Sequence, residues 1–130
     1  MSHKYYVDPR EREDIRAHHG ENVWVVLNHI RVEKRETFEH FMHTILMPAV
    51  ANIHPETYNQ IRVLHPAGPN DDGTFTYIFL MDPVLPGGVY EISRILHEYY
   101  KAELASEYMK IWDEALAAPQ VEYELIQSEW

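Results

Sequence analysis

Two segments of this sequence are apolar on both faces when each is written as a β-strand. The segment 22–32 carries Trp24, Val26, Ile30 and Val32 on one face and Val23, Val25 and Leu27 on the other. The segment 74–81 carries Phe75, Tyr77, Phe79 and Met81 on one face and Ile78 and Leu80 on the other. A strand with two apolar faces is covered on both of them. We therefore expect these two strands in the middle of a sheet that is covered on both sides.

Two further segments have one apolar face and are expected to be outer strands. The segment from Tyr58 to His65 places Ile61, Val63 and His65 on one side and ends before Pro66. In the segment 121–127 the apolar side chains are expected to point inward, namely Val121, Tyr123 and Leu125. The acidic side chains of Glu122 and Glu124 are expected to point outward.

Helical periodicity occurs in two regions. From Lys34 to Val50 the apolar stripe is formed by Phe38, Phe41, Met42, Ile45 and Ala49. Pro48 is expected to kink or end this helix, because proline lacks a backbone donor. From Tyr90 to Ala117 the stripe changes phase near Lys101, which predicts two consecutive helices.

The resulting element order is strand, helix, strand, strand, helix, strand. This βαββαβ order predicts an α+β, ferredoxin-like domain over residues 22–130. Right-handed crossovers then give an antiparallel sheet with the strand order 4-1-3-2. Helices cover one face of such a sheet, so we expect a second copy of the chain to cover the other and to form a homodimer. Residues 1–21 are an N-terminal extension, in which a short helix from Pro9 to His18 is possible.

This architecture resembles the dimeric α+β barrel superfamily, whose small βαββαβ domains pair sheet to sheet. The resemblance spans residues 22–130 and includes the strand that ends in Leu64-His65-Pro66, the turn Asp72-Gly73 and the closing segment 123–127. It implies a ligand pocket between the sheet and the helices. Members include cofactor-free quinone-forming monooxygenases, polyketide cyclases, muconolactone isomerases, haem enzymes and proteins without known activity. The resemblance therefore implies a fold and not one function.

Charge and composition narrow the partners. Eleven Lys and Arg against 21 Asp and Glu give a net charge of −10, which repels nucleic acid and anionic membranes. The sequence lacks cysteine, which excludes disulfides, thiolate catalysis and Cys-ligated metals, and is typical of a cytoplasmic protein. The N-terminus has no secretory signal pattern, and no apolar run is long enough to span a membrane.

His29 and His65 are the first catalytic candidates. Both lie toward the C-terminal ends of strands that are expected to run parallel to each other. If the rings point toward the helices, they line the pocket, where a neutral imidazole can act as a general base on an acidic C–H or phenolic O–H. His65 is favoured because it follows Ile61 and Val63 on the covered face. The alternative for each is a buried, hydrogen-bonded histidine.

Four other residues are secondary candidates. Tyr77 can donate a proton or simply pack its ring. Asn28 can bind a substrate carbonyl or enolate oxygen, or equally a neighbouring side chain. Arg62 can hold a substrate carboxylate or be paired at an interface. Trp24 belongs to the aromatic supply of the chain and is a candidate for contact with an aromatic substrate.

No metal or cofactor is expected. Glu36, His40 and His43 share one helix face, but that face is opposite the apolar stripe and turned to solvent. The sequence contains no glycine-rich phosphate loop.

Two functions remain open at this stage. One is a cofactor-independent monooxygenase, isomerase or cyclase that acts on an aromatic or polyketide-like molecule. The other is a non-catalytic domain that binds a ligand or a partner. A cavity lined by His29 or His65 would favour the enzyme, and a filled core would favour the second function.

Overall fold

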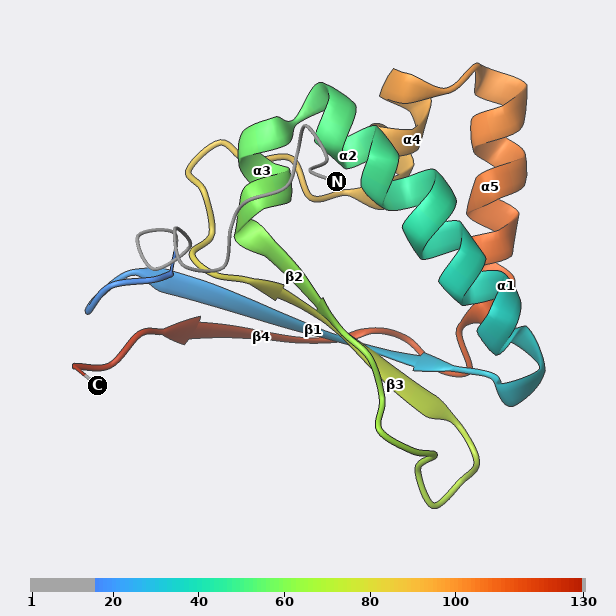
Figure 1. Cartoon of the computed structure of the whole chain (residues 1–130), viewed down its shortest axis with the longest axis horizontal. Coiled ribbons are helices and arrows are strands. Elements are labelled where there is room, and N and C mark those ends of the chain that lie inside the picture. The colour runs from blue at the N-terminus through green and yellow to red at the C-terminus, as the bar shows by residue number, and fades with distance from the viewer. Residues whose placement is uncertain (1–15, 130) are drawn as a thin grey trace, which may run out of the picture.

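The protein, as described by a computed structural model over residues 16–129, is an α+β domain built on one four-stranded sheet (Figure 1). The strands are β1 (Asn22–Ile30), β2 (Ile61–Leu64), β3 (Phe75–Met81) and β4 (Val121–Ile126). Their order is β2-β3-β1-β4, and every neighbouring pair is antiparallel. The predicted order 4-1-3-2 is confirmed, read from the opposite edge, and the topology is compatible with a ferredoxin-like fold.

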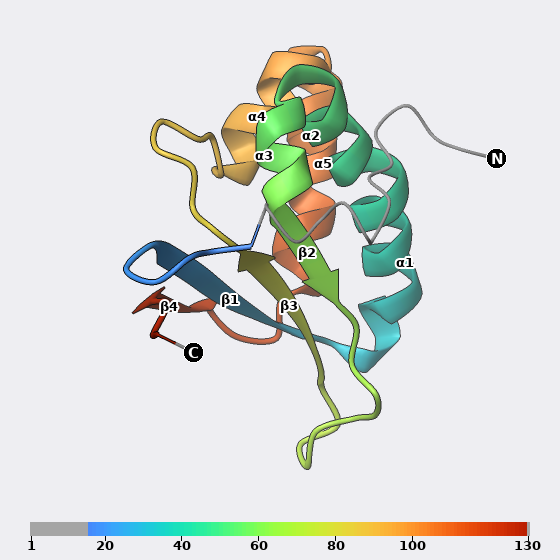
Figure 2. The same cartoon turned by 60° about the vertical axis from the view of Figure 1, so that its left-hand side comes forward.

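The helices all lie on one side of the sheet (Figures 1 and 2). The first helical region contains the 3₁₀ turn η2 (Val32–Lys34), α1 (Arg35–His40), the π-helix η3 (Phe41–Leu46), α2 (Met47–Ile53) and α3 (Pro55–Gln60). The second contains α4 (Ile92–Tyr99) and α5 (Ala102–Ala115). The two helices are separated at Tyr100, whose backbone is extended. The predicted division into two helices near Lys101 is confirmed.

Pro48 does not end the first helix. The backbone widens into the π-helix η3 immediately before it and continues as α2 to Ile53. Proline removes one backbone donor and crowds the carbonyl four residues earlier, and the wider π turn relieves that crowding.

A second difference concerns the segment before β2. Residues 58–60 were expected to be extended, but they belong to α3, and β2 begins only at Ile61. Pro55 occupies the first turn of α3 and Glu56 adds an acidic residue there, both of which favour a helix start.

The possible helix from Pro9 to His18 lies mostly outside the described residues, and Arg16 to His18 are not helical. The backbone amide of Ala17 donates to Oδ1 of Asp82 over 2.7 Å, and that of Gly20 to the carbonyl of Gln127 over 2.9 Å. Residues 17–20 are thus attached to the domain beside the ends of β3 and β4.

Strand register separates two faces of the sheet. Trp24, Val26, Asn28 and Ile30 lie opposite Met81, Phe79, Tyr77 and Phe75, on the face toward the helices. The main core lies between this face and the helices. Its largest fully buried side chains are Tyr77, Phe38, Phe41, Ile30, Met42, Leu96, Val50 and Asn28.

The opposite side of the sheet, here called the helix-free face, is also apolar. By strand pairing it contains Val23, Val25, Leu27, Leu64, Ile78, Leu80, Val121, Tyr123 and Leu125. Tyr123 is 51% exposed and Leu125 is 49% exposed. The expectation that the apolar residues of β4 point into the domain is therefore wrong, because they pair beside Val23, Val25 and Leu27 on this face, and Glu122 and Glu124 lie on the helix side.

None of the helices within residues 16–129 is long and apolar enough to cross a membrane.

Candidate functional site

A cavity of about 460 Å³, here called the sheet–helix cavity, lies between the sheet and the helices. Its wall is mostly apolar. The sheet supplies Trp24, Val26, Ile61, Phe79 and Met81, and the helices supply Leu46, Met47, Val50, Ile92, Ile95, Met109 and Trp112. The strand register explains the sheet side of this wall, because all five sheet residues lie on the helix-facing side of the pleat.

Five polar residues complete the wall among the described residues: Tyr90, Glu91, Ser93, Gln120 and Glu122. The Tyr90 ring meets the Trp24 ring edge-on, with 5.7 Å between centroids. Its hydroxyl accepts a hydrogen bond from the backbone amide of Leu85 over 2.8 Å. Burial raises the pKa of Tyr90, so this hydroxyl is neutral at physiological pH.

Of the candidate residues from the sequence, Trp24 lines the sheet–helix cavity, and the other five are not part of its wall. Asn28 is fully buried, and both ends of its amide are bonded within the protein. Its Nδ2 donates to the carbonyl of Tyr77 over 3.2 Å, and its Oδ1 accepts from Nε2 of Gln120 over 2.6 Å. This second bond positions Gln120 at the cavity.

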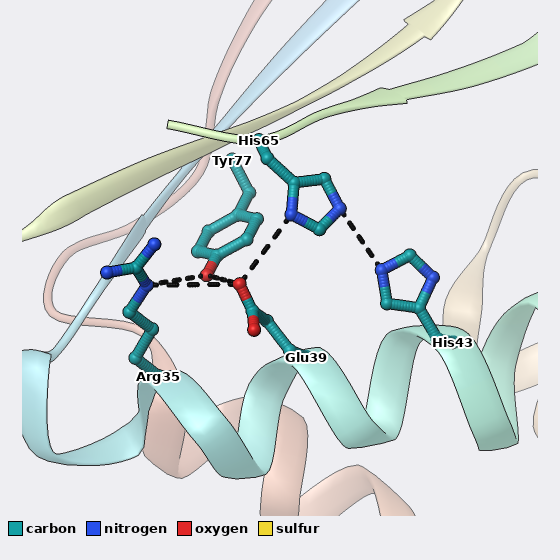
Figure 3. A network of polar contacts seen from close by, with 5 residues as sticks. All are labelled: Arg35, Glu39, His43, His65 and Tyr77. Atoms are coloured by element: carbon teal, nitrogen blue, oxygen red, sulfur yellow. Dashed lines mark hydrogen bonds and ion pairs between the residues drawn. The ribbon is translucent and has the colours of Figure 1, made fainter. Parts of the chain in front are cut away.

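His65 and Tyr77 come together in a different place, in the polar network of Figure 3. The network consists of Arg35, Glu39, His43, His65 and Tyr77. The hydroxyl of Tyr77 donates to Oε1 of Glu39 over 2.6 Å and accepts from Nε of Arg35 over 3.1 Å. Nδ1 of His65 lies 3.6 Å from the same Glu39 oxygen, and its Nε2 lies 3.1 Å from Nε2 of His43.

The network stabilises a charged carboxylate beside a neutral phenol. The hydrogen bond from Tyr77, together with the positive charge of Arg35, lowers the pKa of Glu39. Burial and the bond to Glu39 raise the pKa of Tyr77. The hydrogen bond to Tyr77 raises the pKa of Arg35, which stays cationic. Glu39 is thus a negative charge that Tyr77, Arg35 and His65 all face.

The arrangement at His65 can support proton transfer. A neutral His65 with its proton on Nδ1 directs it at Glu39 and leaves Nε2 to accept the proton of His43 Nε2. The two imidazole rings are nearly parallel, at 17° to each other, with centroids 5.1 Å apart, and both side chains are exposed. A substrate that displaced His43 would meet a basic nitrogen whose orientation is set by a carboxylate.

The network and the sheet–helix cavity are separate. The Phe38 ring lies between Tyr77, at 4.9 Å, and Trp112, at 5.6 Å, and Trp112 is part of the cavity wall. None of the five network residues lines that cavity. A molecule inside the cavity therefore does not contact His65.

His29 and Arg62 face away from both places. Strand pairing puts both on the side of the sheet opposite the helices, so the condition under which His29 would line the pocket is not met. Nδ1 of His29 lies 2.8 Å from Oγ1 of Thr76, its cross-strand neighbour. Arg62 is paired with Asp82 through a hydrogen-bonded ion pair.

Across residues 16–129, no group of three or more His, Asp or Glu side chains is arranged to hold a metal ion. Glu36 and His40 are exposed, as their helix face predicts. His43 is exposed as well, and its Nε2 lies 3.1 Å from Nε2 of His65.

Two parts of these sites were missed in the sequence. Arg35, Glu39 and His43 recur every four residues and so share a helix face, which is a signal that the sequence does contain. Tyr90, Glu91 and Gln120 lie in connections, where periodicity gives no such signal.

No protein-family model matches the chain, and comparisons with curated proteins and with solved structures found no match.

Proposed function

We propose that this protein is a dimeric α+β barrel that binds a small, largely apolar molecule in the sheet–helix cavity. The observation that carries the proposal is the cavity itself. Its volume of about 460 Å³ is in the usual range for small-molecule sites, and a mostly apolar wall with a few polar groups is typical of such sites.

Dimerisation is supported by the helix-free face. Val121 is 36% exposed, Leu64 is 44% exposed, and they belong to one continuous apolar surface across all four strands. Large contiguous apolar surfaces are rare on monomers. A second copy is the proposed occupant, because a two-fold axis brings the same surface of each copy together.

Binding without catalysis is favoured over an enzyme that uses the cavity. His43 and His65, the imidazoles of the network, lie beyond Phe38, and no histidine of residues 16–129 lines the cavity.

The test uses N-phenyl-1-naphthylamine, a neutral probe whose fluorescence rises in apolar surroundings. We expect saturable binding to the full-length protein and none to variants that fill the cavity from opposite walls, Val26→Phe and Met109→Trp. Val32→Phe is the matched control, because Val32 is 61% exposed and outside the cavity. Thermal unfolding shows which variants remain folded. Unchanged binding in both filled variants would refute the proposal.

A second candidate function is acid–base catalysis at His65. It is favoured by one observation, the Glu39 carboxylate 3.6 Å from His65 Nδ1. The substrate would bind at the exposed side of the network, and the chemistry would need no cofactor.

This candidate is tested on any compound that native mass spectrometry finds bound to the purified protein. Loss of a general base typically costs about 10²–10⁴-fold in rate. We expect His65→Gln to lose that much turnover, and His29→Gln to retain the wild-type rate because His29 is on the other face. Equal rates in both variants would exclude His65 as the base.

A further inference from the structure

The charged groups of the sheet–helix cavity are all acidic. Among residues 16–129, Glu91 and Glu122 line it, and no lysine, arginine or histidine does. The chain as a whole carries a net charge of −10, which reinforces the negative potential at this site. The neutral hydroxyl of Tyr90 adds no charge.

The two carboxylates lie beside aromatic rings. Glu122 on β4 pairs with Val26, which makes it the diagonal cross-strand neighbour of Trp24 on the helix-facing side. Diagonal neighbours on a sheet are within reach of long side chains. Glu91 directly follows Tyr90, whose ring contacts that of Trp24. Two carboxylates and two contacting rings therefore belong to the wall of the same cavity.

Neither carboxylate has another role in the described structure. Glu91 occupies the N-cap position of α4, but its side chain makes no capping hydrogen bond. Within residues 16–129, no ion pair or hydrogen bond engages the side chain of Glu91 or of Glu122. Both are exposed at the edge of the cavity, where they remain hydrated until a ligand binds.

The start of α4 is the one opposing feature. A helix N-terminus is equivalent to about half a positive charge and would favour an anion. Two full negative charges outweigh it, so an anionic ligand would be repelled and a cationic one attracted.

We infer that the sheet–helix cavity selects an apolar molecule that carries a single ammonium group. The apolar body lies among the aliphatic and aromatic side chains, and the ammonium lies at the exposed edge of the cavity, where it pairs with Glu91 and Glu122 beside the Trp24–Tyr90 ring pair. Carboxylates pair with the charge, and aromatic rings attract it through the cation–π interaction. The inference rests on the proposed function, since it names the class of ligand for the same cavity.

The test compares three naphthalene derivatives of nearly equal size by calorimetry at low salt: 1-naphthylmethylamine, 1-naphthalenemethanol and 1-naphthoate. We expect the amine to bind about tenfold more tightly than the alcohol, and the carboxylate more weakly than either. The double variant Glu91→Gln/Glu122→Gln should lose the preference, so that it binds the amine only as tightly as it binds the alcohol. Glu124→Gln is the control, because Glu124 shares the strand and face of Glu122 but is not part of the cavity wall.

The outcomes separate the two proposals. If the alcohol binds but the amine gains nothing, or if the double variant keeps the preference for the amine, the cationic ligand is refuted and the cavity remains a binding site. Tightest binding of 1-naphthoate would also refute it and would assign the site to the α4 N-terminus. If none of the three binds, the proposed function itself fails.

Discussion

The hydroxyl of Tyr77 donates a 2.6 Å hydrogen bond to Oε1 of Glu39, and this bond connects the middle of the sheet to the first helix. Tyr77 is fully buried on β3, whereas Glu39 lies at the edge of α1 with 35% of its side chain exposed. The same carboxylate oxygen lies near Arg35 and His65. The bond therefore both stabilises the domain and orients the exposed histidines.

Replacing Tyr77 by Phe should destabilise the domain. The variant keeps the ring that packs on Phe38 but removes the bond to a charged group, which is worth roughly 1.5–3 kcal/mol. Urea unfolding should show this loss in the free energy of unfolding with an unchanged slope. Tyr99→Phe is the control, because Tyr99 is 42% exposed and its hydroxyl makes no hydrogen bond within the described residues, so its change should stay below about 0.5 kcal/mol. If both substitutions lowered the free energy of unfolding equally, the hydrogen bond between Tyr77 and Glu39 would not stabilise the domain.

Glu39 should make part of the stability dependent on acid pH. Its pKa is lower in the folded protein than in the unfolded chain, chiefly because of the bond from Tyr77. Its contribution is therefore present above the unfolded pKa of about 4.3 and is lost as the pH falls through the folded pKa. At pH 7 the free energy of unfolding of the wild type should exceed that of Glu39→Gln by at most about 1 kcal/mol, since the Glu39 carboxylate is partly exposed. That difference should shrink toward pH 3.

Urea unfolding at a series of pH values measures this difference. Glu36→Gln, an exposed carboxylate on the same helix, is the control and should show no such trend. A gap between wild type and Glu39→Gln that stays constant from pH 7 to pH 3 would show that the charge of Glu39 is not stabilised by folding.

Much of the fold could be predicted because two-sided apolar patterns identify central strands. The segments around Val25 and Ile78 are apolar on both sides, and they form the adjacent central strands β1 and β3. The orientation of β4 could not be predicted in the same way. Alternation shows that Val121, Tyr123 and Leu125 lie on one face of the strand, but it does not show whether that face is toward the helices or away from them. Only the pairing with β1 decides it.

The candidate site was less predictable, for a similar reason. A shift of one residue in a strand moves a side chain to the other face. His29 and Asn28 are adjacent on β1, yet Asn28 is bonded in the core and His29 pairs with Thr76 on the far side. The contact of His65 with Glu39 also depends on how the first helix crosses the sheet, which sequence spacing does not specify.

The helix-free face predicts a homodimer that a single charge should disrupt. Val25 lies near the middle of that face, between Leu80 on β3 and Tyr123 on β4. An interface of this kind typically buries more than about 2,000 Å². Light scattering should give the mass of a dimer for the wild type. For Val25→Lys it should give the mass of a monomer, or thermal unfolding should show that the variant no longer folds.

Val32→Lys is the control for that experiment, because Val32 is 61% exposed and lies outside the sheet. It should remain dimeric with an unchanged melting temperature. A wild-type chain that is a stable 15.4 kDa monomer at micromolar concentration would exclude the dimer.

Gly88 should be needed for ligand binding although it does not line the cavity. A Cβ at this position would lie 2.8 Å from Cε2 and the hydroxyl oxygen of Tyr90, so Gly88→Ala must displace that ring. The displaced ring loses its bond from the amide of Leu85, worth about 1 kcal/mol, and its edge contact with Trp24.

We expect several-fold weaker binding of N-phenyl-1-naphthylamine by Gly88→Ala. Gly68→Ala should bind as the wild type does, because a Cβ added there would have no heavy atom within 4 Å beyond its chain neighbours. If Gly88→Ala binds the probe normally, the position of the Tyr90 ring does not determine the shape of the cavity.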